Sequence, residues 1–553
     1  MRLFHTILFA LILLLPLSAA NRLDIQNSIP NYIKPGSRAA VHALYKANGY
    51  KPFWTGEENA KQLAALLEAL GNPLFNYKYK QFNQERIIDL ALENESNAEL
   101  DILATEAYLN LIHFIRVGDV DWALVKRKLD GLKAAQDVRA TWEIRPKGMP
   151  SPESMCNAIT GKHIRGYLTT LLPLVDQYKP LVAMLERYRN MPNFSRIPFG
   201  KILKRGRTDS RIRTIKKLLQ FTGDFPKNES TGTGYTKSLS RAISRFKERF
   251  NLAKGDYIDN KTIKYLNTAK ADYTKKILTN LDMLKLQPHR FEASHVQINV
   301  PEFRLRYYQG GREVFRSDII VGRIDRPTPL FSDKIEYMVL NPTWTITDNL
   351  VKRDLIPVLK KNPDYLKKNN IRVFTSYRKG AKEASLDLQK LFSYEHSKKH
   401  VPYRFVQYPS VQNALGRVKF MFPNKYAVYL HDTNNKSLFK YRYRVYSSGC
   451  MRVRRPYDFM YALLRDAGNS FSKSKLEKIF DSNKPTTIRL KRSVPVHVLY
   501  QTVRRDKGRD YFFYDVYMYE QIVYESTAGH KQASFRVPTV RLTKINRIGA
   551  RIR

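Results

Sequence analysis

The spacing of apolar residues changes along this chain, from a helical repeat in its first part to an alternation typical of strands in its second. From Ala39 to about Tyr188, apolar residues recur every three to four positions, as on the buried face of a helix. The clearest stripes are Leu63, Leu66, Leu67 and Leu70, and Tyr108, Leu111, Ile112 and Ile115. From Val296 onward, short runs alternate apolar and polar residues. The sequence therefore predicts an α+β protein in which a helical part precedes a mostly-β part.

The length of the chain requires several domains. At about 100–200 residues per domain, its 553 residues correspond to three or four units. A hydrophobic content of 43% and an aromatic content of 12% can fill several cores, which excludes wholesale disorder. We predict a helical scaffold domain, a small three-helix domain, a mostly-β domain with a helical insertion, and a basic tail, at residues 21–195, 196–270, 290–525 (insertion 349–400) and 526–553.

Individual elements of the mostly-β domain can be placed from the same periods. Strands are predicted at residues 296–300, 303–308, 314–321, 337–340, 418–422, 427–430, 494–500 and 511–519. Two helices, at residues 350–362 and 385–392, interrupt this β pattern. The insertion is therefore predicted to be helical.

The first twenty residues have the pattern of a secretory signal peptide. Arg2 precedes an apolar run over residues 7–15, Pro16 breaks the run, and residues 18–20 (Ser-Ala-Ala) offer a cleavage site before Asn21. The alternative is an uncleaved membrane anchor, but the run is shorter than the roughly 20 residues that span a bilayer. We therefore expect an exported protein, for which genomic DNA and other nucleic acids are not partners.

Charge and cysteine content narrow the chemistry further. The 96 Lys and Arg outnumber the 50 Asp and Glu and give a formal charge of +46, which indicates a polyanionic partner. The two cysteines, Cys156 and Cys450, are too few for a disulfide framework. Either they form a single bridge, or at least one is a thiol retained for its reactivity. Within the helical part, Cys156 is most simply a small buried apolar residue.

The surroundings of Cys450 contain the parts of a thiol active site. His431 follows a predicted strand, and Cys450 comes nineteen residues later in the sequence Ser447-Ser448-Gly449-Cys450-Met451-Arg452. Cysteine catalysis needs a thiolate, an imidazole that takes its proton, and backbone donors for an oxyanion. Gly449 allows a close approach of the backbone to a carbonyl group. Arg452 and Arg454 are expected to lower the pKa of the thiol.

This segment resembles the signature of the L,D-transpeptidase catalytic domain, the YkuD-like fold, in which a strand that carries a histidine precedes a Ser-x-Gly-Cys-x-Arg loop. Other segments resemble the large YcbB-type branch of Gram-negative bacteria, namely residues 321–323 with 328–329, 341–344, 413–420, 422–424 and 431–433. Residues 203–223, 235–250 and 262–267 resemble the small three-helix peptidoglycan-binding domain. Lys247 and Asp259 depart from the usual pattern of that domain.

The resemblance implies roles for individual residues. Cys450 is expected to be the nucleophile, His431 its general base, and the N–H groups of Gly449 and Cys450 the oxyanion hole. Arg452 is expected to order the loop or to pair with a carboxylate of the peptide. Either Asp432 or a backbone carbonyl would orient His431. Ser448 is also expected to have a direct role in the reaction. Contacts with the substrate are expected for Trp344, Tyr429 and Ser447.

The reaction that the resemblance implies is acyl transfer between peptidoglycan peptide stems in the periplasm. Cys450 would attack the L-centre carbonyl of diaminopimelate in a tetrapeptide donor, and a second diaminopimelate amine would open the thioester to give a 3→3 cross-link. No cofactor is needed, and no metal is implied because His and Cys do not cluster at ligand spacing. The insertion would act as a lid, other wall synthases would be partners, and the positive charge would hold the protein weakly to the anionic envelope.

Other readings of the same sequence stay open. The site could serve as an L,D-carboxypeptidase, or attach or release a wall-linked lipoprotein. The chain could instead be a catalytically inactive wall-binding scaffold, although the presence of both His431 and Cys450 argues against this. Papain-like and NlpC-type peptidases place Cys before His, the reverse of the order here. Sortases share the order but use a wider spacing and a different motif.

Overall fold

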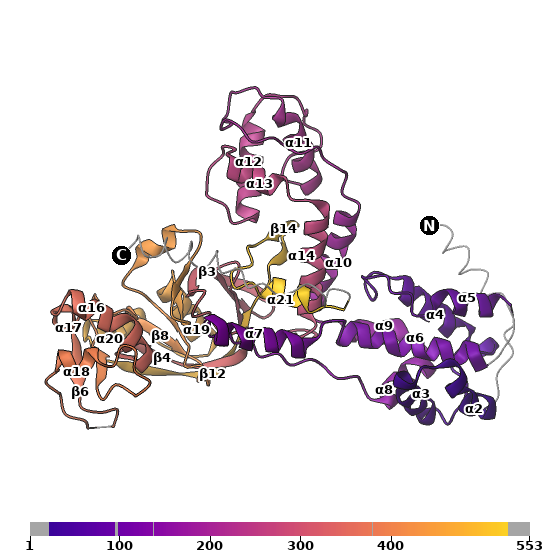
Figure 1. Cartoon of the computed structure of the whole chain (residues 1–553), viewed down its shortest axis with the longest axis horizontal. Coiled ribbons are helices and arrows are strands. Elements are labelled where there is room, and N and C mark those ends of the chain that lie inside the picture. The colour runs from indigo at the N-terminus through magenta and orange to yellow at the C-terminus, as the bar shows by residue number, and fades with distance from the viewer. Residues whose placement is uncertain (1–21, 94–97, 137, 379, 529–553) are drawn as a thin grey trace.

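The computed structural model describes residues 22–93, 98–136, 138–378 and 380–528. The predicted signal peptide and residues 529–553 of the predicted tail lie outside these ranges. Figure 1 shows an elongated molecule, with a group of helices at one end, a sheet domain at the other, and a smaller group of three helices that projects between them. No helix in these ranges is long and apolar enough to cross a membrane.

Helices form the N-terminal part, as the 3.6-residue period predicts. They are α2 (Arg22–Tyr32), α3 (Pro35–Ala47), α4 (Ala60–Gly71), α5 (Gln84–Leu92), α6 (Ala98–Arg116), α8 (Pro152–Thr160), α9 (Ile164–Leu171) and α10 (Val175–Arg189). The buried carboxylate of Asp101 on α6 accepts hydrogen bonds from the Tyr45 hydroxyl and from the N–H groups of Phe53, Trp54 and Thr55. These bonds fix an aromatic turn against the central helix. Cys156 on α8 is buried, with 5% of its surface exposed.

Helix α7 (Trp122–Gln136) lies apart from the other N-terminal helices and packs on the sheet domain. Val125 and Leu129 belong to the core of the sheet domain, and single bridges join Val120 to Thr527 and Trp142 to Leu330. This stretch of the helical part therefore crosses to the sheet domain, and the predicted domain bounds of 21–195 stay a prediction. An apolar period identifies a helix face but does not identify the core that the face joins.

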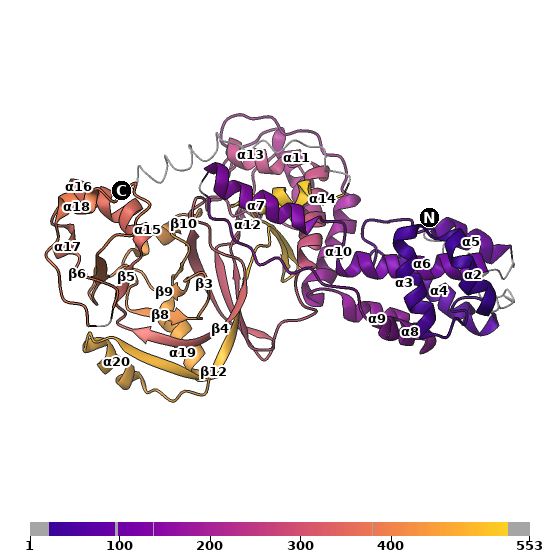
Figure 2. The same ribbon diagram turned by 60° about the horizontal axis from the view of Figure 1, so that its bottom comes forward.

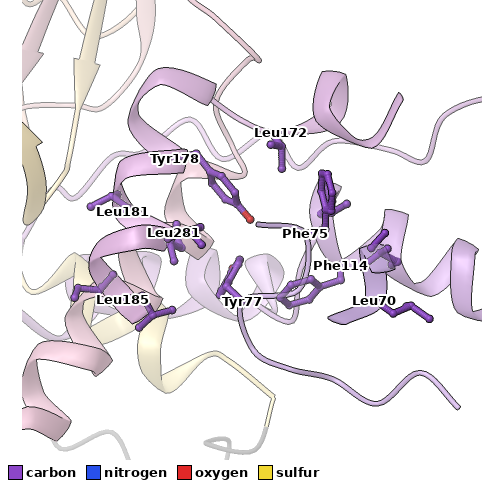
Figure 3. Packing of buried hydrophobic residues seen from close by; sticks show 14 of the residues in the cluster. Leu70, Phe75, Tyr77, Phe114, Leu172, Tyr178, Leu181, Leu185 and Leu281 are labelled. Carbon is purple, nitrogen blue, oxygen red and sulfur yellow. The ribbon is translucent and has the colours of Figure 1, made fainter. Parts of the chain in front are cut away.

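Three helices form within residues 196–270, namely α11 (Arg211–Thr222), α12 (Lys237–Arg249) and α13 (Asn260–Leu266). They are carried by α10 and by α14 (Lys270–Leu284), a helix that the sequence analysis did not predict. Figure 3 shows Tyr178, Leu181 and Leu185 of α10 beside Leu281 of α14. Peptidoglycan binding by the three helices stays a prediction.

The sheet domain contains nine strands in the order β10-β3-β11-β9-β8-β4-β12-β1-β2, and an additional β2–β3 pairing joins its two sides. The strands are β1 (His295–Asn299), β2 (Arg304–Gln309), β3 (Arg312–Gly322), β4 (Ser332–Leu340), β8 (Val418–Met421), β9 (Leu430–His431), β10 (Val445–Ser447), β11 (Met451–Val453) and β12 (Thr486–Leu499). Helices α19 (Pro456–Asp466), α20 (Lys473–Asp481) and α21 (Tyr519–Glu525) complete it. The hairpin of β13 (Val503–Asp506) and β14 (Arg509–Phe512) packs through Val503 and Phe512 into the helical core instead.

Most of the predicted strands are confirmed, and two are corrected. Only Leu430 of the strand predicted at 427–430 is in β9, and the strand predicted at 511–519 ends at Phe512. Tyr519 begins α21 instead. The Tyr-rich residues after Phe512 have high strand propensity, but the aromatic side chains of Tyr517 and Tyr519 pack in the core from a loop and a helix, so tertiary packing overrides the local preference.

The insertion is a mixed α/β unit and not helical alone. Its elements are β5 (Trp344–Ile346), α15 (Asp348–Leu350), a π-helical turn (Val351–Leu355), α16 (Ile356–Lys361), α17 (Tyr365–Lys368), β6 (Ile371–Phe374), α18 (Leu388–Phe392) and β7 (Arg404–Gln407). The three strands form a separate sheet in the order β5-β7-β6, over a core of their own. Strands of three or four residues are too short for alternation to identify them.

A buried ion pair stabilises the β1–β2 turn. Arg306 Nη1 lies 2.7 Å from Glu302 Oε2, and both side chains are almost fully buried. Burial alone would raise the pKa of the Glu302 carboxyl, but the charge of Arg306 outweighs it and holds this pKa at about 2. The ionised carboxylate is therefore more stable in the folded chain than in the unfolded chain.

Glu302→Gln is expected to lower the free energy of unfolding by about 3 kcal/mol at neutral pH. It removes the carboxylate nearest the buried Arg306 charge, and the remaining acids, Glu313 and Asp506, lie farther away, at 3.3 and 3.8 Å. The stabilisation by Glu302 is present above its unfolded pKa and is lost as the pH falls toward 2. Urea denaturation should therefore show a gap between wild type and variant that narrows between about pH 5 and pH 3. The matched control is Glu477→Gln, on the exposed Glu477. Equal stability of Glu302→Gln and wild type would contradict the prediction.

Candidate active site

The predicted catalytic residues meet on one face of two adjacent parallel strands. In the β9–β11 pair, Leu430 lies opposite Met451 and His431 opposite Arg452. The Met451 N–H donates to the Tyr429 carbonyl at 3.0 Å, which places Cys450 beside Tyr429. Because side chains alternate along a strand, Leu430 and Met451 enter the core, whereas Tyr429, His431, Cys450 and Arg452 share the opposite face. The fold therefore brings Cys450 and His431 to neighbouring positions.

The loop before Cys450 is held by its own hydroxyl and by a threonine from a distant segment. The Ser447 hydroxyl accepts from the Gly449 N–H at 3.3 Å and donates to the Cys450 carbonyl. The Thr328 hydroxyl donates to the Gly449 carbonyl at 2.9 Å. Gly449 has a φ of 114°, in the region that favours glycine. Ser447 is buried and orders the loop, and its contact with substrate stays a prediction.

The thiol of Cys450 is mostly buried, and this determines its ionisation. Burial raises the pKa of the Cys450 thiol to about 11, although Tyr429, Arg452 and Lys419 each act to lower it. The expectation that nearby arginines give a net lowering of this pKa is therefore wrong, because desolvation outweighs the cations. Cys450 and Cys156 are both free thiols, which excludes a bridge between them in this structure.

His431 is buried and uncharged. Burial, followed by the charge of Arg452, lowers the pKa of its imidazole to about 3. In the described part of the chain, its Nδ1 has no hydrogen-bond partner. The ring lies edge-on to Tyr429, with 5.7 Å between the ring centroids. The resting site therefore combines a neutral thiol with a neutral imidazole that can accept a proton.

The Asp432 carboxylate is directed away from His431. One of its oxygens accepts from the Arg417 N–H at 2.9 Å, and the other pairs with Lys436. Gly416 lies against this carboxylate, where any added Cβ would clash with it. The backbone of Asp432, not its side chain, interacts with the imidazole. The Asp432 side chain therefore does not orient His431 in this structure, and orientation by a backbone carbonyl stays a prediction.

The insertion contacts the nucleophile loop through Arg326. Its guanidinium pairs with Asp354 of the insertion at 2.5 Å and donates to the Ser448 hydroxyl at 3.0 Å. A cavity of about 340 Å³ lies at this junction, between Arg323 and Arg326 on one side and residues 352–354, 357 and 395–396 on the other. Trp344 packs against the core of the insertion. A lid function stays a prediction, but a physical link between the insertion and Ser448 is present.

Three residues that the sequence analysis assigned no role also shape the site. Thr328 and Arg326 hold the loop from a segment more than a hundred residues away, and a local sequence pattern contains no sign of such contacts. Lys419 lies opposite His431 in the β8–β9 pair, on the same face as Cys450. The alternation of Val418, Lys419 and Phe420 in the predicted strand was a usable signal, because it turns Lys419 away from the core.

Iodoacetamide is expected to alkylate Cys450 at a rate that rises about tenfold per pH unit between about pH 6 and pH 9. The thiolate is the reactive form, and with a pKa of about 11 its fraction grows over this whole interval. Mass spectrometry of a Cys156→Ser variant, in which Cys450 is the single thiol, gives the rate. A plateau below about pH 8 would contradict the prediction, because it would indicate a thiolate already stabilised by an imidazolium.

Comparison with known proteins agrees with this geometry. Residues 293–482 match the L,D-transpeptidase catalytic domain family, YkuD, and residues 39–185 match the scaffold domain family. A Haemophilus influenzae protein named "Putative L,D-transpeptidase" is 30% identical over 258 residues, which are 46% of this chain and 50% of that protein. The chain thus spans about half the length of this curated relative.

Two solved structures share weaker similarity. The L,D-transpeptidase (residues 123–326) from Xylanimonas cellulosilytica aligns with 55% of this chain and 99% of its own, at 12% identity and a TM-score of 0.16. The Ldtfm-avibactam carbamoyl enzyme aligns with 38% of this chain and 52% of its own, at 13% identity and a TM-score of 0.17. The family match and the curated relative thus agree that residues 293–482 are similar to the L,D-transpeptidase catalytic domain.

Proposed function

We propose that this protein forms 3→3 cross-links between peptidoglycan peptide stems, through a thioester on Cys450 and with His431 as the general base. The observation that carries the proposal is the placement of a free thiol and a neutral imidazole on one face of adjacent strands. A cysteine nucleophile beside a base is the arrangement that covalent acyl transfer requires. The catalytic domain family supplies the substrate class.

In the first half-reaction, Cys450 Sγ attacks the L-centre carbonyl carbon of diaminopimelate in a tetrapeptide donor. Because the thiol is protonated at rest, His431 takes its proton during the attack. The Cys450 N–H, which has no acceptor in the described chain, is the donor best placed for the oxyanion. The Gly449 N–H is occupied by Ser447. His431 then protonates the amine of D-alanine as the C–N bond breaks, which leaves a thioester.

In the second half-reaction, the side-chain amine of a diaminopimelate in another stem attacks the thioester carbonyl. His431 removes a proton from the attacking amine and returns it to the departing sulfur, so that the thiol is regenerated. One amide bond is broken and one is formed, and the thioester retains the energy between the two steps. Water in place of the amine would give carboxypeptidase activity. The insertion, whose Asp354 pairs with Arg326 beside Ser448, would limit the access of water.

The setting of the reaction is part of the same proposal. Residues 1–20 would export the protein to the periplasm of a Gram-negative bacterium, and the wider sequence resemblance would place it in the YcbB-type branch. The +46 charge would hold the protein near stem carboxylates and other envelope anions by weak, salt-screened attraction. Other wall synthases would supply its substrates.

The test is to incubate the purified protein with wall fragments that contain tetrapeptide stems, and to analyse the products by mass spectrometry. The expected products are 3→3 dimers, free D-alanine and an acyl adduct on Cys450. Carbapenems should form an adduct at the same residue. Tripeptide monomers without dimers would indicate hydrolysis instead, and products linked to a lipoprotein would indicate attachment. The absence of both products and adduct would contradict the proposal and favour an inactive scaffold.

A further inference from the structure

Two cations flank the imidazole on the face that holds the thiol. The strand order β11-β9-β8 places Arg452, His431 and Lys419 in one row across the sheet, because Arg452 and Lys419 are both in register with His431. Cys450 and Tyr429 lie one step along the same two strands. The Lys419 ammonium lies over the Tyr429 ring, 5.4 Å from its centroid. Both positive charges are therefore directed to the surroundings of the thiol.

Neither of these cations has an acidic partner in the described part of the chain. The Arg452 side chain makes no hydrogen bond or ion pair there, and its Nε is buried without an acceptor. The Lys419 side chain makes none either, and it contacts the Tyr429 ring and interacts electrostatically with Cys450. Some other buried cations have acidic partners, as in Arg306 with Glu302 and Arg249 with Asp224, whereas Lys216 and Lys247 lie over aromatic rings. The nearest acid in sequence, Asp432, is already paired with Lys436.

Half-buried charges without partners are costly, so their retention beside a nucleophile points to an anionic ligand. Burial disfavours the charged form of both side chains, and a bound carboxylate would restore the lost interactions. Guanidinium and ammonium groups together suit a carboxylate, which accepts several charge-assisted hydrogen bonds. A donor stem offers two carboxylates near its scissile bond, that of the leaving D-alanine and that of the D-centre of diaminopimelate.

The resemblance already allows Arg452 to pair with a carboxylate of the peptide. We propose that Lys419 joins it to form a carboxylate-binding subsite beside Cys450, which recognises a free carboxylate of the donor stem. The inference rests on the proposed function and deepens it. In this arrangement Lys419 is a specificity-determining residue that contacts the donor. It selects donor stems that present a carboxylate within reach of the thiol, and it does not discriminate between acceptor amines.

The test measures kcat/KM for thioester formation with three donors, in wild type and in Lys419→Met. The donors are a tetrapeptide, its C-terminal amide, and a tetrapeptide with the D-centre carboxylate of diaminopimelate amidated. Wild type should lose about tenfold or more when the recognised carboxylate is amidated. Lys419→Met should have a kcat/KM for the tetrapeptide that is lower than that of wild type by a similar factor. Amidation of the recognised carboxylate should change the kcat/KM of this variant very little. Lys419→Arg should recover most of the discrimination, and the matched control Lys491→Met, at an exposed lysine of β12, should keep all of it.

The two amidated donors identify which carboxylate is bound, and coupling of Lys419 to either one supports the subsite. If Lys419→Met kept the full wild-type preference for both carboxylates, the inference would be overturned. It would also be overturned if the variant slowed iodoacetamide alkylation as much as acylation by every donor, since Lys419 would then act on the thiol alone. If wild type acylated with no donor at all, the proposed function would fail instead, so the two failures are distinguishable.

Discussion

Cys450→Ala is expected to form no acyl adduct and no 3→3 dimer, with a fall of at least about a thousandfold in D-alanine release. Covalent transfer depends on the sulfur, because Lys419 and Tyr429, the other nucleophile-bearing side chains described on this face, are a cation and a phenol whose pKa burial raises. Ser448 is held by Arg326, and the Ser447 hydroxyl is engaged with Gly449 and Cys450 inside the loop. Mass spectrometry of the protein and of its products measures both losses.

Cys156→Ala is the matched control for this variant. Cys156 is buried on α8, in a core that is separate from the sheet domain, so its removal creates a small cavity and leaves the active site intact. Dimers should form at close to the wild-type rate. If Cys450→Ala still produced dimers, or if Cys156→Ala abolished them, the assignment of the nucleophile would be wrong. Circular dichroism of both variants tests whether each remains folded.

The chemistry of the site was predictable from sequence because its key groups lie in one short segment. A segment of 22 residues contains His431, Gly449, Cys450 and Arg452. A strand followed by a glycine-containing loop can bring these residues together whatever the packing of the rest of the domain. The β alternation around Val418 and Val296 was equally local, and the strands there are confirmed. Such features depend on neighbours in the chain, which a sequence displays directly.

The parts that could not be predicted depend on distant contacts. The net direction of the Cys450 pKa shift follows from how deeply the thiol is buried, and the sequence shows the arginines but not the burial. The Asp432 carboxylate turns toward the Arg417 N–H because Gly416 leaves room for it there. Helix α7 has an ordinary apolar stripe that fits either core. In each case the local pattern was compatible with two outcomes, and tertiary packing selected one.

His431→Gln is expected to lower the rate of thioester formation by about 10² to 10⁴ near neutral pH. The thiol pKa of about 11 leaves very little thiolate at neutral pH, so the attack depends on a base that removes the proton as the bond forms. The imidazole, with a pKa of about 3, is ready to do so throughout the physiological range. The rate of thioester formation by wild type should therefore change little between about pH 6 and pH 9. The rate of the variant should rise with pH, because hydroxide replaces the missing base.

The dependence on pH separates this role from a loss of structure. His497→Gln is the matched control, because His497 is also buried and also has a lowered pKa, of about 4, but it bonds to Ser332 and Glu292 away from the thiol. A destabilised sheet would slow both variants at every pH and leave the shape of the profile unchanged. Loss of the general base should steepen the pH–rate profile of His431→Gln and leave the shape of the His497→Gln profile unchanged. If His431→Gln and wild type had parallel profiles, the proton would have to leave Cys450 by another route, and Tyr429, whose side chain interacts with the thiol, would be the next group to test.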